Sequence, residues 1–247
     1  MTSPTQKHAL ITGASRGIGR STALAFAQAG IDLVLVGRSQ GELASVAELA
    51  QHAAQQAQTS IQVQVAALDL VDLPQVKPRI AQLCDQYGPI DILVNNAGMG
   101  YTGPLGDMPL EDWQQVLNLN LTSVFLCIQG ALPTLRSRDY STIINISSIA
   151  AHQAFPDWGA YSVSKAGLVA LSQAIAVEER CHGVRVTVVT PGATNTGLWD
   201  TETVQADFDR GQMLHPDTIA RSILHVALAP AGSVVESVVV TPSAGAL

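Results

Sequence analysis

Short runs of branched apolar residues alternate along the chain with longer stretches in which apolar residues recur at helical spacing. The short runs predict seven strands, at residues 8–12, 32–37, 61–68, 90–98, 141–148, 184–192 and 234–242. The longer stretches predict helices at residues 18–29, 42–57, 76–88, 110–138, 160–183 and 216–228, the fourth with room for a bend. Strands that are apolar without interruption indicate burial on both faces, as in a parallel sheet covered by helices.

The regular alternation of strands and helices predicts the fold class. It is typical of an α/β protein with a doubly wound, mostly parallel, seven-stranded sheet and helices on both faces. No linker, repeat or low-complexity segment divides the 247 residues, so we expect one domain over residues 1–247. Ligands of such sheets bind at the carboxyl ends of the strands.

Composition and charge narrow the classes of partner. The formal net charge of −7 argues against broad nucleic-acid binding, and no run approaches the roughly 18 apolar residues of a membrane span. The first residues lack the apolar core of a signal peptide. Cys84, Cys127 and Cys181 form no C-x-x-C pair, and the six His residues form no H-x-x-x-H pair. We therefore expect free thiols and a cytoplasmic protein with no membrane, nucleic-acid or metal partner.

Three glycines between Thr12 and Gly19 separate the first predicted strand from the first predicted helix. Glycine lets a phosphate approach the backbone, and a helix N-terminus offers free N–H groups; a plain tight turn is the alternative interpretation. The second strand ends in Gly37-Arg38-Ser39, with no carboxylate to hold a ribose 2′-hydroxyl. Arg38, unless it is only a solvated loop residue, is suited with Arg16 to a 2′-phosphate. The sequence thus predicts NADP(H) in preference to NAD(H).

Further motifs occur in a fixed order along the chain. They are T-G-x-x-x-G-x-G from Thr12, N-N-A-G from Asn95, Ser148, Y-x-x-x-K at Tyr161–Lys165, and P-G-A-T-N-T after the sixth strand. Together they resemble the short-chain dehydrogenases/reductases over nearly the whole chain. The resemblance implies a Rossmann fold and an oxidoreductase that moves a hydride between NADP(H) and a carbonyl or alcohol substrate, similar to the 3-oxoacyl-[acyl-carrier-protein] reductase type.

Tyr161 and Lys165 lie four residues apart in a predicted helix and therefore share a face. A phenol ordinarily has a pKa near 10, and a nearby ammonium, together with an oxidised nicotinamide, is expected to lower that pKa. Tyr161 is thus the candidate general acid/base. For a Y-x-x-x-K pattern without the other motifs, the alternative interpretation is a Tyr packed in the core beside a Lys whose amine reaches solvent. The resemblance implies that Lys165 also binds the nicotinamide ribose.

The resemblance implies roles for two more residues. Ser148, preferred to Ser147 because it stands thirteen residues before Tyr161, would polarise the substrate carbonyl. Asn120, preferred to Asn118, matches the family's helix-kink Asn whose carbonyl holds a water of the proton relay. The predicted catalytic residues are therefore Asn120, Ser148, Tyr161 and Lys165.

The resemblance also places the cofactor along the strand ends. Asp69 and Leu70 match an adenine contact, and Thr196 matches the residue that holds the nicotinamide carboxamide. Alone, Asp69 would be interpreted as a turn or capping residue. The predicted cofactor-binding residues are Gly13, Ser15, Arg16, Gly17, Ile18, Gly19, Arg38, Asp69, Leu70, Asn96, Ala97, Gly98, Tyr161, Lys165, Pro191, Gly192, Thr194 and Thr196.

Residues 197–214 match the family's mobile substrate lid. The candidates for an apolar pocket wall, each of them otherwise a core or rim residue, are Leu198, Trp199, Phe208, Met213, His152, Phe155 and Trp158. The acidic residues of the lid are Asp200, Glu202, Asp207 and Asp209. Unless they only face solvent, they disfavour a multiply anionic substrate.

The substrate and the assembly stay open at this level. Family members that act on acyl carrier protein carry Arg near the ends of two long helices, whereas here Arg136 and Arg138 fit one helix and His182 occupies the other. Positive charge would therefore attract an acidic acyl-thioester carrier only weakly. A free ketone, or a 3-hydroxy acid oxidised in the reverse direction, agrees equally well with the sequence. The apolar segments 126–135 and 168–177 resemble the family's four-helix interface and predict a homodimer or homotetramer.

Two functions without catalysis are the alternatives. A regulator that senses NADP(H) would need only the glycine loop and Arg38, and has no need of Ser148, Tyr161 and Lys165 at these spacings. A scaffolding role explains neither set of residues.

Overall fold

Seven parallel strands form the centre of the computed structural model, which describes residues 6–206 and 208–245. The strands are β1 (His8–Thr12), β2 (Asp32–Gly37), β3 (Val63–Ala67), β4 (Ile92–Asn95), β5 (Ser141–Ile146), β6 (Val184–Pro191) and β7 (Ser237–Val240). They follow the order β3-β2-β1-β4-β5-β6-β7, and every neighbouring pair is parallel. The predicted doubly wound α/β fold is confirmed.

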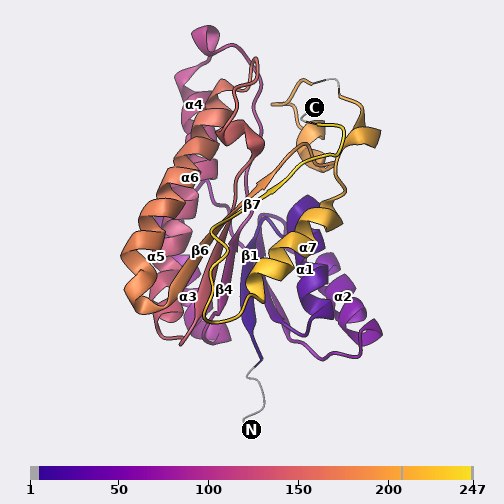
Figure 1. The fold of residues 1–247 in the computed structure, drawn as a ribbon, viewed down its shortest axis with the longest axis vertical. Helices are drawn as coiled ribbons and strands as arrows, with labels where there is room; N and C mark the ends of the chain where they lie inside the picture. The colour runs from indigo at the N-terminus through magenta and orange to yellow at the C-terminus, as the bar shows by residue number, and fades with distance from the viewer. Residues whose placement is uncertain (1–5, 207, 246–247) are drawn as a thin grey trace.

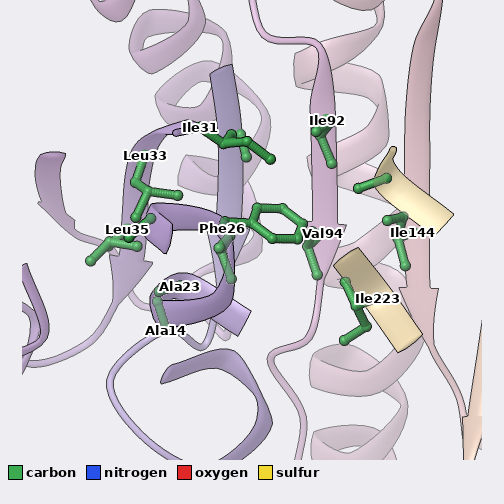
Figure 2. Packing of buried hydrophobic residues seen from close by; sticks show 14 of the residues in the cluster. Ala14, Ala23, Phe26, Ile31, Leu33, Leu35, Ile92, Val94, Ile144 and Ile223 are labelled. Carbon is green, nitrogen blue, oxygen red and sulfur yellow. The ribbon is translucent and has the colours of Figure 1, made fainter. Parts of the chain in front are cut away.

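Helices cover both faces of this sheet (Figure 1). One face carries α1 (Gly17–Gln28), α2 (Gln40–Gln56) and α7 (Pro216–Ala227). The other face carries α3 (Leu73–Tyr87), α5 (Ser123–Arg136) and α6 (Gly159–Glu179), with α4 (Leu110–Leu117) leading into α5. Because successive strand residues point to opposite faces, Ile11 and Leu10 of β1 enter different apolar cores. Phe26 of α1 lies within the first core, near Val94 of β4 (Figure 2).

Element boundaries differ from the prediction mainly where the chain leaves the sheet early. The strand predicted over 90–98 pairs only over Ile92–Asn95, because the next residues turn towards β1 and bond its end. The strand predicted over 234–242 pairs only over Ser237–Val240. β7 has a neighbouring strand on one side alone, so fewer of its residues are held in the ladder.

Two helical segments, Leu110–Arg136 and Gly159–His182, have the length and mean hydropathy of a membrane span, although polar residues interrupt the apolar positions of both. Each segment buries a stripe in the second core, through Ile128 on α5 and Leu168 on α6, for example. Packing on a sheet that is itself apolar demands this composition from the helices that cover it.

The strand order changes direction at β1. β2 and β3 lie on one side of β1, whereas β4 to β7 lie on the other. Helical connections therefore leave the sheet on opposite sides at this point and open a crevice at the carboxyl ends of β1 and β4.

Candidate active site

A pocket of about 630 Å³ occupies this crevice. Its wall runs from Arg38 and Asp69, past the loop after β1, to Tyr161 and the lid segment. All the predicted cofactor residues contribute to the wall except Gly19. A pocket of this volume lies within the range of natural cofactor sites.

The glycine loop is packed against the segment that follows β4. Gly13 has a φ of +64°, and a Cβ atom there would lie 2.8 Å from the Cα of Ala97. A Cβ at Gly19 would overlap the carbonyl oxygen of Gly13 and the side chain of Asn96. Gly19 was predicted as a cofactor contact, but it lies beneath the loop. Its lack of a side chain serves close packing of α1 under the loop.

Hydrogen bonds hold the two segments together. The Thr12 hydroxyl accepts from the backbone N–H of Asn96 (3.1 Å) and of Ala97 (3.2 Å). The Asn96 amide donates to the carbonyls of Thr12 and Gly13, both at 3.0 Å. The N-N-A-G motif thus shapes the floor of the pocket.

The N-terminus of α1 is open to an anion. Arg16 occupies the position before the helix and makes no capping hydrogen bond, and the first turn carries no acidic residue. α2, by contrast, is capped by the Ser39 hydroxyl, which accepts from the N–H of Glu42 at 3.3 Å. Since a helix N-terminus has unpaired N–H groups, the loop and Arg16 fit a dinucleotide's phosphates. Arg38, exposed at the end of β2, fits an additional phosphate at the adenosine end.

Tyr161 and Lys165 project from the first half of α6 into the pocket. The Lys165 Nζ lies 5.7 Å from the centroid of the Tyr161 ring and donates to the carbonyl of Ile146 at 2.9 Å. Lys165 is 5% exposed, and burial lowers its pKa to about 8. It therefore carries its charge at neutral pH, held by a backbone carbonyl at the end of β5.

The pKa of Tyr161 shifts in the direction opposite to the one expected. Burial raises the pKa of Tyr161 above its ordinary value of 10, and a hydrogen bond with the Ser148 hydroxyl opposes this rise. The lowering expected from Lys165 is wrong for the protein itself, because loss of hydration disfavours the phenolate more than its neighbours favour it.

Ser148 begins a short helical turn, Ile149–Ala151, directly after β5. Its hydroxyl accepts from the N–H of Ala150 at 3.2 Å and remains on the pocket wall. Ser147, the competing candidate, also borders the pocket but is 3% exposed and donates to the carbonyl of Lys165 at 3.2 Å. The geometry therefore favours Ser148 as the hydroxyl that a substrate meets.

Asn120 sits at the bend of the helix predicted over 110–138. The segment Asn118–Thr122 is a single wide turn in which the N–H of Ser123 donates to the carbonyl of Asn118. Asn120 is fully buried; its side chain pairs with both backbone groups of Met99, each at 2.9 Å, and donates to the Ser164 hydroxyl at 3.0 Å. It does not border the pocket, so it acts on the site by holding other residues or through its backbone.

The lid is tied to the loop that follows β4. Thr203 donates to the carbonyl of Gly100 at 2.8 Å, and the N–H of Thr102 donates to the carbonyl of Thr203 at 2.8 Å. Arg210, which no motif in the sequence marks, donates to Asn195 Oδ1, the Thr196 carbonyl and Asp200 Oδ2 at 3.0 to 3.1 Å. These bonds hold the lid segment against the part of the pocket wall that includes Gly100 and Thr196.

The predicted substrate residues divide into two groups. Phe155, Trp158, Leu198, Trp199 and Phe208 lie on the pocket wall. Met213 is buried and His152 is exposed, and neither borders the pocket. The acidic lid residue 207 lies outside the described part of the chain. The wall also includes residues without any recognised motif: Met99, Gly100, Gln115, Leu119, Thr201 and Thr203.

The arginines considered for docking a carrier protein are engaged elsewhere. Arg136 makes two hydrogen bonds to Glu179, which is 3% exposed, and Arg138 bonds Asp91, which is 5% exposed. The arginine lowers the pKa of Glu179. Both pairs lie at the amino ends of the strands, at the opposite edge of the sheet from the pocket.

A dinucleotide crevice with Ser148, Tyr161 and Lys165 on its wall defines an oxidoreductase class, and comparison with known proteins agrees. The family model described as short chain dehydrogenase matches residues 7–207. The chain therefore belongs to the short-chain dehydrogenase family.

Relatives carry different named activities. The chain is 37% identical over 239 residues to a 3-oxoacyl-[acyl-carrier-protein] reductase of Synechocystis sp., covering 94% of each chain. It is 33% identical over 243 residues to a sepiapterin reductase of Chlorobaculum tepidum, covering 96% of each. Among solved structures, an alcohol dehydrogenase of the archaeon Thermococcus sibiricus complexed with 5-hydroxy-NADP superposes with a TM-score of 0.86 at 26% identity, covering 96% of this chain and 97% of that one. Membership of the family thus leaves the substrate open.

Proposed function

We propose that this protein is an NADPH-dependent oxidoreductase that reduces a carbonyl compound to an alcohol. One observation carries the proposal: Ser148, Tyr161 and Lys165 meet on one wall of the pocket whose other end is formed by the glycine loop and Arg38. This arrangement joins an acid that can protonate an oxygen to a crevice of dinucleotide size.

The chain's own residues position and protonate the substrate. Ser148 donates a hydrogen bond to the carbonyl oxygen, which polarises it. When bound, the nicotinamide supplies the hydride that the carbonyl carbon accepts. Tyr161 donates its phenolic proton to the oxygen as negative charge develops there, so the product is a neutral alcohol. Lys165 would hold the nicotinamide ribose, and a water held by the Asn120 carbonyl would return the proton to Tyr161.

The shift in the pKa of Tyr161 favours the reductive direction. A raised pKa keeps the phenol protonated at neutral pH, which is the form needed to donate a proton. Oxidation of a 3-hydroxy acid or another alcohol would need the phenolate, which burial disfavours in the protein without cofactor. Carbonyl reduction is therefore the direction that we propose.

The cofactor preference rests on charge at the end of β2. Arg38 follows Gly37 there, where a carboxylate would otherwise bind a ribose 2′-hydroxyl and repel a 2′-phosphate. Arg16 adds a second guanidinium on the same wall. We therefore infer that NADP(H) is preferred to NAD(H).

Exposed apolar side chains on α5 and α6 support a homodimer or homotetramer. Phe125, Val163 and Val177 are 38%, 45% and 72% exposed, on helices whose opposite stripes are already buried on the sheet. Two such helices from each of two copies would cover this face. The acidic pI of about 5.2 and the packing of the apolar helices on the sheet fit a cytoplasmic protein.

The direct test is consumption of NADPH and NADH with simple ketones, aldehydes, a quinone and a 3-oxoacyl thioester. We expect turnover with NADPH, and Tyr161→Phe should lower kcat by about 10²- to 10⁴-fold while changing the Kd of NADPH less than about twofold. The exposed Tyr140→Phe serves as the matched control.

Turnover at the native rate by Tyr161→Phe would contradict the mechanism. Tight binding of NADPH with neither carbonyl reduction nor alcohol oxidation would favour the alternative, a regulator that senses NADP(H).

A further inference from the structure

We propose that the substrate is a neutral carbonyl compound with a planar aromatic group close to the carbonyl, such as an aryl ketone or aryl aldehyde. This inference rests on the proposed function and names the substrate class of the same site. It follows from the aromatic side chains of the substrate end, their contacts with one another, and the distribution of charge around the pocket.

Aromatic rings line the substrate end without interruption. The Trp158 ring meets the Tyr161 ring edge to face with centroids 5.2 Å apart, and meets Trp199 at 5.6 Å. Trp199 meets Phe208 at 5.4 Å in the same manner. The row of contacting rings thus begins at Tyr161, the proposed proton donor, and continues into the lid. A substrate group that packs against these rings therefore lies close to the carbonyl that Tyr161 protonates.

The Trp199 and Phe208 rings offer only apolar surface to the pocket. The indole N–H of Trp199 donates to the carbonyl of Thr194 at 2.8 Å, so this polar atom is already satisfied within the protein. The same bond fixes the plane of the ring relative to the segment that follows β6. Phe155 and Leu198 extend the apolar wall. A planar ring can meet such a wall in edge-to-face or offset contact, which a saturated ring of the same size cannot do.

Charge at this end of the pocket disfavours an anionic substrate. Glu202 borders the pocket, as does Asp200, which is paired with Arg210. Of the guanidinium groups on the wall, Arg38 lies at the end of β2, whereas Arg16 lies beside Gly197 at the start of the lid, near Asp200. On the described wall, Lys165 is the cation nearest the proposed proton donor, and it is bound to the Ile146 carbonyl. A carboxylate or phosphate on the substrate would therefore lose its hydration without gaining a partner.

The test compares matched carbonyl compounds with NADPH: acetophenone, cyclohexyl methyl ketone, 4-acetylbenzoate and an acetoacetyl thioester. We expect kcat/KM for acetophenone to exceed that for the cyclohexyl ketone by about 5- to 10-fold. Its advantage over 4-acetylbenzoate should be at least about 10-fold. Trp158→Leu and Trp199→Leu should reduce the first ratio towards one, whereas Trp113→Leu, a tryptophan outside the wall, should preserve it. Glu202→Gln should raise kcat/KM for 4-acetylbenzoate alone.

A binding measurement separates this inference from the proposed function. Quenching of tryptophan fluorescence in Trp113→Phe reports on Trp158 and Trp199, whether or not the ligand is reduced. Selective quenching by acetophenone without any turnover would overturn the carbonyl reductase and leave the ligand class standing. Equal or tighter binding of the cyclohexyl ketone, the benzoate or the thioester, or faster turnover of any of them, would overturn the inference itself.

Discussion

The Asn120 amide donates to the Ser164 hydroxyl across 3.0 Å and so joins the wide turn at 118–122 to the helix that carries Tyr161 and Lys165. Ser164 in turn donates to the carbonyl of Tyr161 at 2.7 Å. Both residues are fully buried. A short polar relay thus connects the loop at Met99, the bend and the proposed proton donor.

We expect the two residues to be coupled energetically. Asn120→Ala should lower the free energy of unfolding by about 2–4 kcal/mol because it strands the backbone groups of Met99, and Ser164→Ala by about 1–2 kcal/mol. A double-mutant cycle measured by urea unfolding should give a coupling of about 0.5–2 kcal/mol. Asn120→Ala paired with the distant Ser222→Ala on α7 is the control. Additive effects for the first pair would show that the hydrogen bond contributes nothing.

Arg38 is predicted to decide between the two dinucleotides. Arg38→Ala should raise the Kd of NADPH by about 10- to 100-fold, since a charge-assisted bond to a phosphate is lost, and the Kd of NADH by less than about threefold. Isothermal titration with both cofactors measures this. Arg79→Ala on the surface of α3 is the charge-matched control. Equal weakening of both cofactors would assign Arg38 a structural role.

Arg210 is predicted to act as a positioning residue for the lid. Removing its guanidinium frees Asn195, Thr196 and Asp200 together, so Arg210→Ala should raise KM for the carbonyl substrate and the Kd of NADPH by about 5- to 50-fold. Limited proteolysis should cut within 197–214 faster than in the native protein. Arg210→Lys should recover only part of the effect, because an ammonium lacks the fork that reaches three acceptors.

A variant on α7 serves as the control for Arg210→Ala in both the kinetic and the proteolysis measurements. Arg221→Ala, exposed on that helix, should change neither measurement. Unchanged proteolysis together with an unchanged KM in Arg210→Ala would show that the bonds of Thr203 to Gly100 and Thr102 hold the lid without Arg210.

Burial of Lys165 predicts a pH-dependent stability. Its folded pKa of about 8 lies below the ordinary value of 10.5, so the unfolded chain binds this proton more tightly. The free energy of unfolding of the native protein should therefore rise between pH 8 and 10.5, by up to about 3 kcal/mol from this group, and lose that gain as the pH falls through 8. Lys165→Met removes the group, so its stability relative to the native protein should be greatest below pH 8.

Urea unfolding at several pH values between 7 and 10 measures this difference. Lys77→Met, at an exposed position of α3, reports the effect of removing one Lys elsewhere. A difference between Lys165→Met and the native protein that does not vary with pH would contradict the burial argument.

The Arg136–Glu179 pair is predicted to serve stability alone. Arg136→Ala leaves a buried carboxylate without its partner and should lower the free energy of unfolding, by less than the loss of one partner of a fully buried pair would, because Arg136 is 44% exposed. Its kcat/KM should stay within about twofold of the native value. Arg180→Ala, exposed beside the pair, is the control. A large loss of kcat/KM for a 3-oxoacyl carrier thioester alone would restore a docking role.

The order of elements could be predicted because short unbroken runs of Val, Ile and Leu between helical stretches are typical of strands buried on both faces. The ends of strands were less predictable. Residues 96–98 follow β4 directly and were included in the predicted strand, but the Thr12 hydroxyl, 84 residues earlier in the chain, accepts from the N–H of Asn96 and draws this segment out of the sheet. The residues around a position in the sequence do not reveal hydrogen-bond partners so far away along the chain.

The same limit applies to the site residues: those in a motif could be predicted from the sequence, whereas those that act through distant hydrogen bonds could not. Tyr161 and Lys165 could be found because they match the family's Y-x-x-x-K motif, and Ser148 because it stands thirteen residues before Tyr161; the structure brings all three to one wall. Arg210 and Ser164 were missed because their importance lies in hydrogen bonds rather than in any motif, although Ser164 stands within the Y-x-x-x-K segment. The partners of Arg136 and Arg138 are 43 and 47 residues away, so their neutralisation was not visible.

The uncapped start of α1 has a consequence for the lifetime of the protein. A Ser or Asp in place of Arg16 would stabilise the helix by about 1 kcal/mol, yet it would occupy N–H groups that are suited to a phosphate. An anion that binds at this helix N-terminus therefore adds to the free energy of unfolding. The folded fraction then increases with the concentration of that ligand. The amount of this protein that survives proteolysis in a cell would follow the supply of dinucleotide.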